Sequence, residues 1–209
     1  MSPTRAASTD PRAARVRAQL KEAAFALVHE RRVADISVAD ITGRADVSRQ
    51  VFYQHFRDRD DAVAGAVGDA LRTAVGTEEP GGAGAGPMAP VHRLVDFAAE
   101  HAELYHNLYP SAASQRAADT FRDLVRPACR RLAEQVIAHR ATEAGEGPAV
   151  SEADAAALTA LLVGGIFEVI RRWTDLRLQH PDTTSPESAR RMLDTCLRLL
   201  GCEIGPPGR

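Results

Sequence analysis

Two short amphipathic segments, separated by a tight turn, constrain the fold of this chain more than any other feature. Ser37 is a good N-cap for a helix over about 38–45, and Ser48 is a good N-cap for a second helix over about 49–55. Each segment has one apolar side, and the letters "ADV" lie between the two. Two helices of one to two turns joined in this way form a helix-turn-helix, in which the first helix braces the second.

The remainder of the chain also predicts helices. Ala, Leu, Arg and Val dominate and aromatic residues make up only 5% of the chain, which favours helices over sheets. Apolar residues at spacings of three and four predict helices over 12–31, 59–75, 91–109, 117–141 (with Pro127 as a kink or break), 152–179 and 186–200, the last closed by Gly201. Gly/Pro-rich loops are expected at 78–90 and 143–152. The predicted fold is therefore all-α, with roughly nine helices and no internal repeat.

The length and the charge distribution suggest how the chain is divided. A chain of 209 residues is long enough for one sizeable core, or for a small and a medium domain. Residues 1–57 hold 10 Lys/Arg against 6 Asp/Glu, whereas the rest holds 16 against 22. A basic head on an acidic body points weakly to a polyanion partner for the head. We expect a flexible tail over 1–11, a helix-turn-helix domain over 12–58 and a second domain over 59–209.

Several classes of protein do not fit the sequence. No apolar run approaches the roughly 20 residues that span a bilayer, and the N-terminus lacks the apolar region of a signal peptide. We therefore expect a cytoplasmic protein with no membrane partner. No nucleophile motif, phosphate loop or pair of catalytic carboxylates stands out, so we expect no catalytic residue and no enzyme.

The metal-ligating residue types show no metal-site spacing. The three cysteines are odd in number and match no zinc motif. His101 and His106 are five residues apart, which does not place both on one helix face. We expect neither a metal site nor a cofactor.

The second short helix begins with residues that suit the DNA major groove. Ser48, Arg49 and Gln50 are small or polar and come first on the helix that a helix-turn-helix presents to base edges. Arg matches guanine and Gln matches adenine, each by two hydrogen bonds. The sequence therefore predicts base contacts from Arg49 and Gln50.

Other polar residues around this helix are placed to contact phosphate. Tyr53 and His55 lie one turn further along, and Ser37 offers a hydroxyl and free backbone N–H groups at a helix start. Arg59 begins the next helix, and Arg44 completes the set of expected DNA contacts. Any one of these residues taken alone is better explained as an ordinary surface position, but the whole set in this order indicates DNA binding.

The sequence also resembles a known family. The stretch ISVADITGRADVSRQVFYQHFRDRDDAV (36–63) is similar to the N-terminal signature of the TetR (tetracycline-repressor-like) transcriptional regulators. The positions that match its spacing are Ser37, Ile41, Ala45, Val47, Ser48, Tyr53, His55 and Phe56. The resemblance implies a homodimer with two three-helix heads that bind a palindromic operator, and a larger helical body for ligand binding and dimerisation.

Several positions depart from the family pattern, among them the following three. Asp46 replaces the usual Gly of the turn, and Asp tolerates the left-handed backbone better than most residues. Thr42 replaces a common Ala, so its hydroxyl needs a backbone partner in a packed position. Arg59 replaces Lys, which keeps the expected phosphate contact.

The family resemblance extends to the last two helices, within 157–201. Such helices form a four-helix dimer interface with their symmetry mates. The expected apolar faces are Leu158, Leu161, Leu162, Gly165, Ile166 and Val169 on the first helix, and Met192, Leu193, Cys196, Leu197 and Leu200 on the second. The alternative is that both faces are buried inside a single subunit.

The resemblance further implies an effector pocket between the middle helices and the penultimate one. Our candidates for its lining are Tyr105, His106, Tyr109, Phe121, Phe167 and Trp173. Ordinary core packing is an equal alternative for each aromatic residue. The implied function is a ligand-responsive regulator, a repressor that a small, partly apolar molecule releases from its operator. A regulator of the same fold without an effector, or one that activates, remains the alternative.

Overall fold

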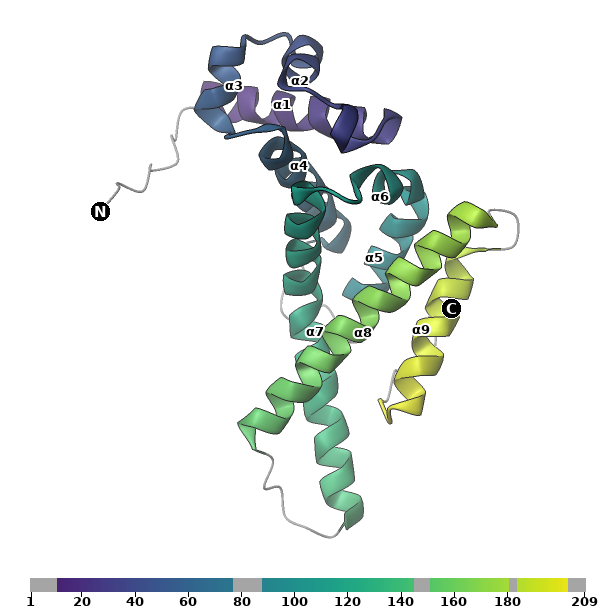
Figure 1. Ribbon diagram of the computed structural model, residues 1–209. Coiled ribbons are helices and arrows are strands. Elements are labelled where there is room, and N and C mark those ends of the chain that lie inside the picture. The colour runs from purple at the N-terminus through teal and green to yellow at the C-terminus, as the bar shows by residue number, and fades with distance from the viewer. Residues whose placement is uncertain (1–10, 77–87, 145–150, 181–183, 203–209) are drawn as a thin grey trace. The chain divides into compact units, whose positions relative to one another are not determined.

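The computed structural model describes residues 11–76, 88–144, 151–180 and 184–202, with side chains up to residue 139 in the second range. All the regular structure in these ranges is helical. The elements are α1 (Pro11–Glu30), a 3-10 turn η1 (Val33–Asp35), α2 (Val38–Ala45), α3 (Arg49–His55), α4 (Arg59–Val75), α5 (Ala89–Glu100), α6 (Ala102–Leu108), α7 (Ala112–Ala144), α8 (Glu152–Gln179) and α9 (Pro186–Leu199) (Figure 1). The all-α prediction is confirmed. The predicted tail over 1–11, apart from Pro11, which begins α1, and most of the two predicted loops lie outside the described residues.

The chain forms two compact units. Unit 1 contains the chain up to Asp69 together with residues 107–117, and unit 2 contains residues 70–106 and the chain from 118 onwards. The segment that joins α6 to α7 thus belongs to unit 1, although most of both helices belongs to unit 2. Sequence periodicity carries no information on such a return of the chain. The predicted division into domains 12–58 and 59–209 stays a prediction.

Unit 1 is built on the apolar stripe of α1. Leu20, Ala24 and Val28 are fully buried and recur every four residues, as a helix with one covered face requires. α2 packs against α1, and α3 packs against α2 (Figure 1). Ile41 and Phe52 are fully buried, and each contributes roughly 1.5–3 kcal/mol by leaving water. This small core holds one side of α3 in place and leaves the opposite side of the helix exposed to solvent.

The segment 107–117 is tied to unit 1 by polar contacts. The Asn107 amide donates to the carbonyl oxygen of Val28 at 3.0 Å, near the end of α1. The Ala113 N–H donates to an Asp60 carboxylate oxygen at 3.2 Å, and Arg116 pairs with Asp61 at 3.3 Å. Both carboxylates belong to the first turn of α4, where negative charge also suits the helix dipole.

In unit 2, α5, α8 and α9 pack on one another. Trp173 of α8 is only 2% exposed, and its indole N–H donates to the Ser188 hydroxyl of α9 at 3.1 Å. Polar pairs join α5 to α9, with His92 at 3.3 Å from Asp194 and Arg190 on both Asp96 oxygens. The buried indole N–H of Trp173 therefore has a partner, as burial demands.

Two of the predicted helices differ from the structure. The expected helix 91–109 is divided at His101, whose backbone (φ −122°, ψ 36°) leaves the helical region and ends α5. Of the kink or break expected at Pro127, the break is wrong, because α7 continues through this residue. Pro127 is exposed, and its buried neighbours Val125, Ala128 and Leu132 retain the helix despite the missing backbone donor.

One helix of the described residues, α8, is long and apolar enough to span a membrane by length and composition. The sequence predicted no such helix, because α8 has no uninterrupted apolar run of this length. Helices in the core of water-soluble proteins pass the same test. One such helix is weak evidence for a membrane span, and 28% of its apolar stretch is buried within the described residues.

Candidate nucleic-acid interface

The start of α2 is held by a reciprocal capping box. The Asp40 N–H donates to the Ser37 hydroxyl at 3.2 Å, and the Ser37 N–H donates to the Asp40 carboxylate at 2.8 Å. The Ser37 hydroxyl also donates to this carboxylate, which Arg31 approaches at 2.9 Å. The bonds from Ser37, followed by the one from Arg31, lower the pKa of Asp40 to about 2. The hydroxyl and N–H that were expected to meet a phosphate are thus already bonded within α2.

The turn between α2 and α3 adopts the geometry that Asp46 allows. Asp46 lies in the left-handed region at φ 52°, as predicted for the residue that replaces Gly. Thr42 is buried, and its hydroxyl donates to the Ala39 carbonyl at 3.2 Å, which confirms the expected backbone partner. The Val47 N–H donates to the Thr42 carbonyl at 3.1 Å and closes the turn.

α3 presents a polar surface to solvent. Ser48 caps the helix by accepting from the Val51 N–H at 3.3 Å, so the first turn is fixed. Arg49 and Gln50 are exposed directly after the cap, and Tyr53 is 57% exposed one turn later. The structure therefore brings four of the sequence-predicted DNA contacts together on one short helix.

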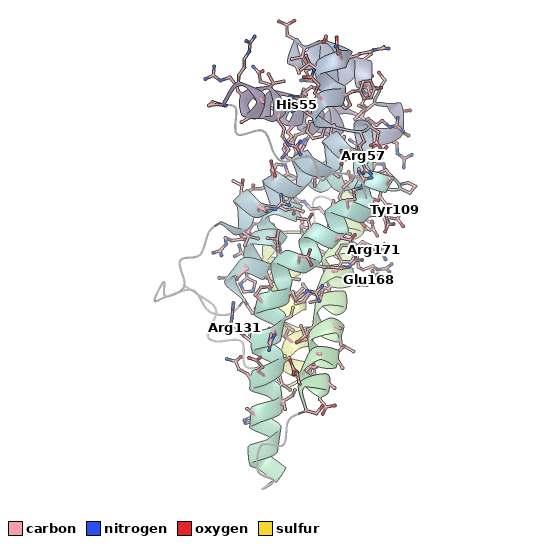
Figure 2. The ribbon with its side chains drawn as sticks, turned by 90° about the vertical axis from the view of Figure 1, so that its left-hand side faces the viewer. His55, Arg57, Tyr109, Arg131, Glu168 and Arg171 are labelled. Atoms are coloured by element: carbon pink, nitrogen blue, oxygen red, sulfur yellow. The ribbon has the colours of Figure 1, made fainter. Side chains whose placement is uncertain are left out.

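His55 ends α3 and is only partly exposed. Burial, followed by the nearby positive charge of Arg17, lowers the pKa of His55. The imidazole is therefore mostly neutral at pH 7, and one of its ring nitrogens carries a proton to donate. His55 and the exposed Arg57 are both labelled in Figure 2.

Two arginines of the predicted set have partners within unit 1. Arg44 pairs with Glu30 at 2.6 Å. Arg59 donates from one terminal nitrogen to the carbonyl oxygens of Ala34 at 2.8 Å and Ile36 at 2.7 Å. Its Nε lies 3.4 Å from Asp60. The guanidinium thus ties the start of α4 to the η1 turn, and its contact with phosphate remains a prediction.

Two exposed polar residues near α3 were not among the predicted DNA contacts. Gln54 lies on the same helix face as Gln50, one turn later, and this spacing of four was a usable signal. Arg57 follows the helix with its side chain 71% exposed and lies 3.8 Å from Asp61. Both extend the polar surface that begins at Ser48.

The predicted effector residues are distributed over both units. Tyr109 belongs to unit 1, whereas Tyr105, His106, Phe121, Phe167 and Trp173 belong to unit 2. The rings of Phe121 and Phe167 meet edge-to-face at 5.4 Å, and the Arg122 guanidinium lies 4.7 Å above the Phe167 ring. Trp173 is used for packing between α8 and α9, while His106 is exposed.

α8 also carries a charged cluster next to Phe167. Glu168 and Arg171 lie together (Figure 2), with Asp175 at 3.1 Å from Arg171 on the following turn. The bond from Arg171 lowers the pKa of Glu168. Within the described ranges, no group of three or more His, Cys, Asp or Glu residues is arranged to hold a metal ion.

Comparisons with known proteins identify the fold through structure alone. No family model matches the chain, and no curated protein matches it. A TetR transcriptional regulator from Rhodococcus sp. RHA1 is similar to the chain, with a TM-score of 0.56 and 19% identity over 89% of this chain and 96% of the other. The dihydroxyacetone kinase operon activator DhaS gives a TM-score of 0.57 at 15% identity, over 88% of this chain and 94% of the other.

A third solved structure is the transcriptional regulator FadR from Bacillus subtilis in complex with stearoyl-CoA. Its TM-score is 0.57 at 12% identity, over 88% of this chain and 96% of the other. All three likenesses extend over nearly the whole length of each chain. The chain therefore has the fold of the TetR-like transcriptional regulators.

Proposed function

We propose that this chain is a cytoplasmic, sequence-specific DNA-binding transcriptional regulator that works as a homodimer on a palindromic operator. In this proposal α3 enters the major groove and Arg49 and Gln50 read base edges. A small, partly apolar molecule bound by the helices of unit 2 releases the operator, so the protein acts as a repressor.

The observation that carries the proposal is the exposed surface of α3. An apolar core fixes one side of this helix, and the other side carries Ser48, Arg49, Gln50 and Tyr53 in sequence order. None of these side chains is needed to bury apolar surface. A short helix that is braced on one side and polar on the other is the arrangement that a helix-turn-helix offers to DNA.

The proposed dimer uses α8 and α9. On α8, Gly164 and Gly165 are exposed, and a Cβ atom at either position would meet no atom within 4 Å. Leu161 is 59% exposed beside them, and Leu199 at the end of α9 is 82% exposed. An exposed leucine beside a pair of exposed glycines suits close packing of a second copy.

Part of each predicted apolar face already packs within one subunit. Leu162, Ile166, Leu193 and Leu197 are buried. The dimer proposal therefore rests on the other members, which are exposed or half-buried.

The dimer is tested by changing the exposed face alone. Leu161→Glu places a charge on it, and Gln135→Glu adds the same charge to an exposed position on α7. We expect sedimentation velocity to give a dimer for the wild type and for Gln135→Glu, and a monomer for Leu161→Glu. A dimer that is unaffected by Leu161→Glu would place the interface elsewhere.

The effector part of the proposal is a two-state mechanism. α4 passes from unit 1 into unit 2, so a shift of this helix on ligand binding would change the separation of the two α3 helices in the dimer. Heads that no longer match successive major grooves, about 34–36 Å apart, lose the operator. The ligand must favour the released state by its differential affinity.

Stearoyl-CoA is the first compound to test, because it is bound in one solved structure of this fold. A ligand that binds tightly yet leaves DNA affinity unchanged would remove this part of the proposal. An activator, or a regulator without an effector, is the second candidate, since one structure of the same fold is an operon activator.

The central test is fluorescence anisotropy with the DNA upstream of the protein's own gene and a random fragment as control. Measurements at about 50 and 200 mM salt separate phosphate contacts from base readout, since only the former set the salt slope. Arg49→Ala is compared with Arg126→Ala, which removes an equal charge from an exposed position on α7.

We expect tight, salt-sensitive binding to the upstream fragment alone, weakened by Arg49→Ala and not by Arg126→Ala. Equal, weak binding to both fragments would mean that the operator lies elsewhere or that binding requires a ligand. A failure to bind either fragment at low salt, with the dimer intact, would refute the proposal.

A further inference from the structure

A side chain of α1 bonds the C-terminal end of α3. Arg17 donates from a terminal nitrogen to the His55 carbonyl oxygen at 2.8 Å, across 38 positions of sequence. The same guanidinium lies 4.6 Å above the centre of the Phe56 ring, within the range of a cation–π contact. One side chain thus holds both the last residue of α3 and the residue that follows it.

α3 needs such a contact because of its length. It has 7 residues, whereas isolated helices shorter than about 12–15 residues are marginal in water. The last carbonyl groups of any helix lack partners within it, and a positive charge at this end also suits the helix dipole. No glycine ends α3, since Phe56 follows in an extended conformation (φ −135°). Arg17 supplies the missing donor and the charge together.

Phe56 is held from more than one side. It is 3% exposed, and its ring centre lies 5.7 Å from that of Phe52 in the core of unit 1. A Cβ atom at Gly65 of α4 would lie 3.5 Å from the Phe56 ring and 3.3 Å from Cε of Lys21, so α4 packs closely here. The Phe56 ring that Arg17 contacts is therefore held in place by its other neighbours. Because the ring is fixed, the contact also fixes the C-terminal end of α3.

The side chains near the end of α3 depend most on this contact. Tyr53 and His55 belong to the final turn, at the opposite end of the helix from the Ser48 cap. A frayed final turn would release both side chains while Arg49 and Gln50 stayed near the cap. Loss of the contact would also let the short helix tilt, which moves every base-reading group at once.

We infer that Arg17 is a positioning residue for DNA recognition, which fixes the C-terminal end of α3 and with it the placement of Tyr53 and His55. The inference rests on the proposed function for its effect on DNA. The contact itself is a property of the free protein and is testable without DNA.

The experiment compares three variants of the full chain. Arg17→Lys keeps the positive charge but loses the planar group that bonds and stacks. Arg17→Gln loses the charge as well. Arg15→Gln is the matched control, since Arg15 is an exposed residue of the same helix. Each protein is measured for affinity to the operator and to a random fragment at two salt concentrations, and for thermal unfolding.

We expect Arg17→Lys to weaken operator binding about tenfold and random-fragment binding by less, with the salt slope unchanged. If Arg17 were instead a phosphate contact, Arg17→Lys would retain operator affinity and Arg17→Gln would weaken both fragments alike. If it only stabilised the fold, operator affinity measured well below the unfolding temperature would stay at the wild-type value. Either result would overturn the inference.

Two measurements on the free protein keep the inference independent of the operator. Amide hydrogens of the last turn of α3 should exchange faster in Arg17→Lys than in the wild type, while those of α2 do not. By NMR, Arg17→Gln should raise the pKa of His55, because the nearby positive charge is gone. Unchanged exchange in α3 would overturn the inference even if the wild type discriminates between the two fragments. Faster exchange without any DNA discrimination by the wild type would count against the proposed function alone.

Discussion

Arg59→Ala separates two roles that the sequence and the structure suggest for one arginine. The sequence predicts a phosphate contact, whereas the structure places one terminal nitrogen of Arg59 on the carbonyl oxygens of Ala34 and Ile36. Removing the side chain takes the donor from both carbonyls. Ala34 is exposed and its carbonyl is free to bond water instead, but Ile36 is 1% exposed.

The magnitude follows from the second carbonyl. A hydrogen bond from a charged donor contributes about 1.5–3 kcal/mol, and an unsatisfied buried acceptor costs about 1–3 kcal/mol. The side chain of Arg59 is 35% exposed, so we take a value below the upper end of both ranges. We expect the free energy of unfolding to fall by about 2 kcal/mol. For a unit of this size, such a loss lowers the midpoint of thermal unfolding by roughly 8–16 °C.

The assay is thermal unfolding by circular dichroism, paired with DNA affinity over a range of salt concentrations. We expect a lower unfolding midpoint and an unchanged salt slope for Arg59→Ala, with Arg126→Ala as the charge control. A salt slope reduced by about 1, with unfolding unaffected, would refute this reasoning and restore the phosphate contact.

Three further perturbations test other parts of the chain. Arg49→Ala should weaken operator binding by about 1–3 kcal/mol and blur the preference at one base pair, without a change in thermal unfolding; equal losses on all DNA would make Arg49 a phosphate contact instead. Acidification should destabilise unit 1, because the lowered pKa of Asp40, about 2, means that its stabilising charge is present above about pH 4 and is lost as the pH falls towards 2. Circular dichroism would follow this loss, and Asp40→Asn should show less of it; an identical acid profile would contradict the capping box. Trp173→Phe should destabilise unit 2 by about 1–2 kcal/mol in chemical denaturation, because Ser188 loses its donor and the smaller ring leaves a gap; an unchanged midpoint would show that the bond contributes nothing.

Local signals in the sequence predicted local structure well. The bounds of α2, α3, α4 and α8 agree with the predicted ranges because each begins at a side-chain cap or an acidic first turn. The left-handed Asp46 and the backbone partner of Thr42 followed from residue chemistry in the same way. The single long helix predicted over 91–109 was wrong, because α5 ends at His101. No Gly or Pro marks this break, so it has no local signal in the sequence.

The sequence by itself determined the all-helical fold, the helix-turn-helix and the polar residues that α3 exposes. These depend on periodicity, caps and turn residues, which act over a few positions. Tertiary structure alone decided that Arg17 bonds the end of α3, that Arg59 bonds the carbonyl oxygens of Ala34 and Ile36, and that residues 107–117 belong to unit 1. Such contacts join residues 23 to 79 positions apart. A long, flexible side chain can reach many partners, so only the folded chain selects one.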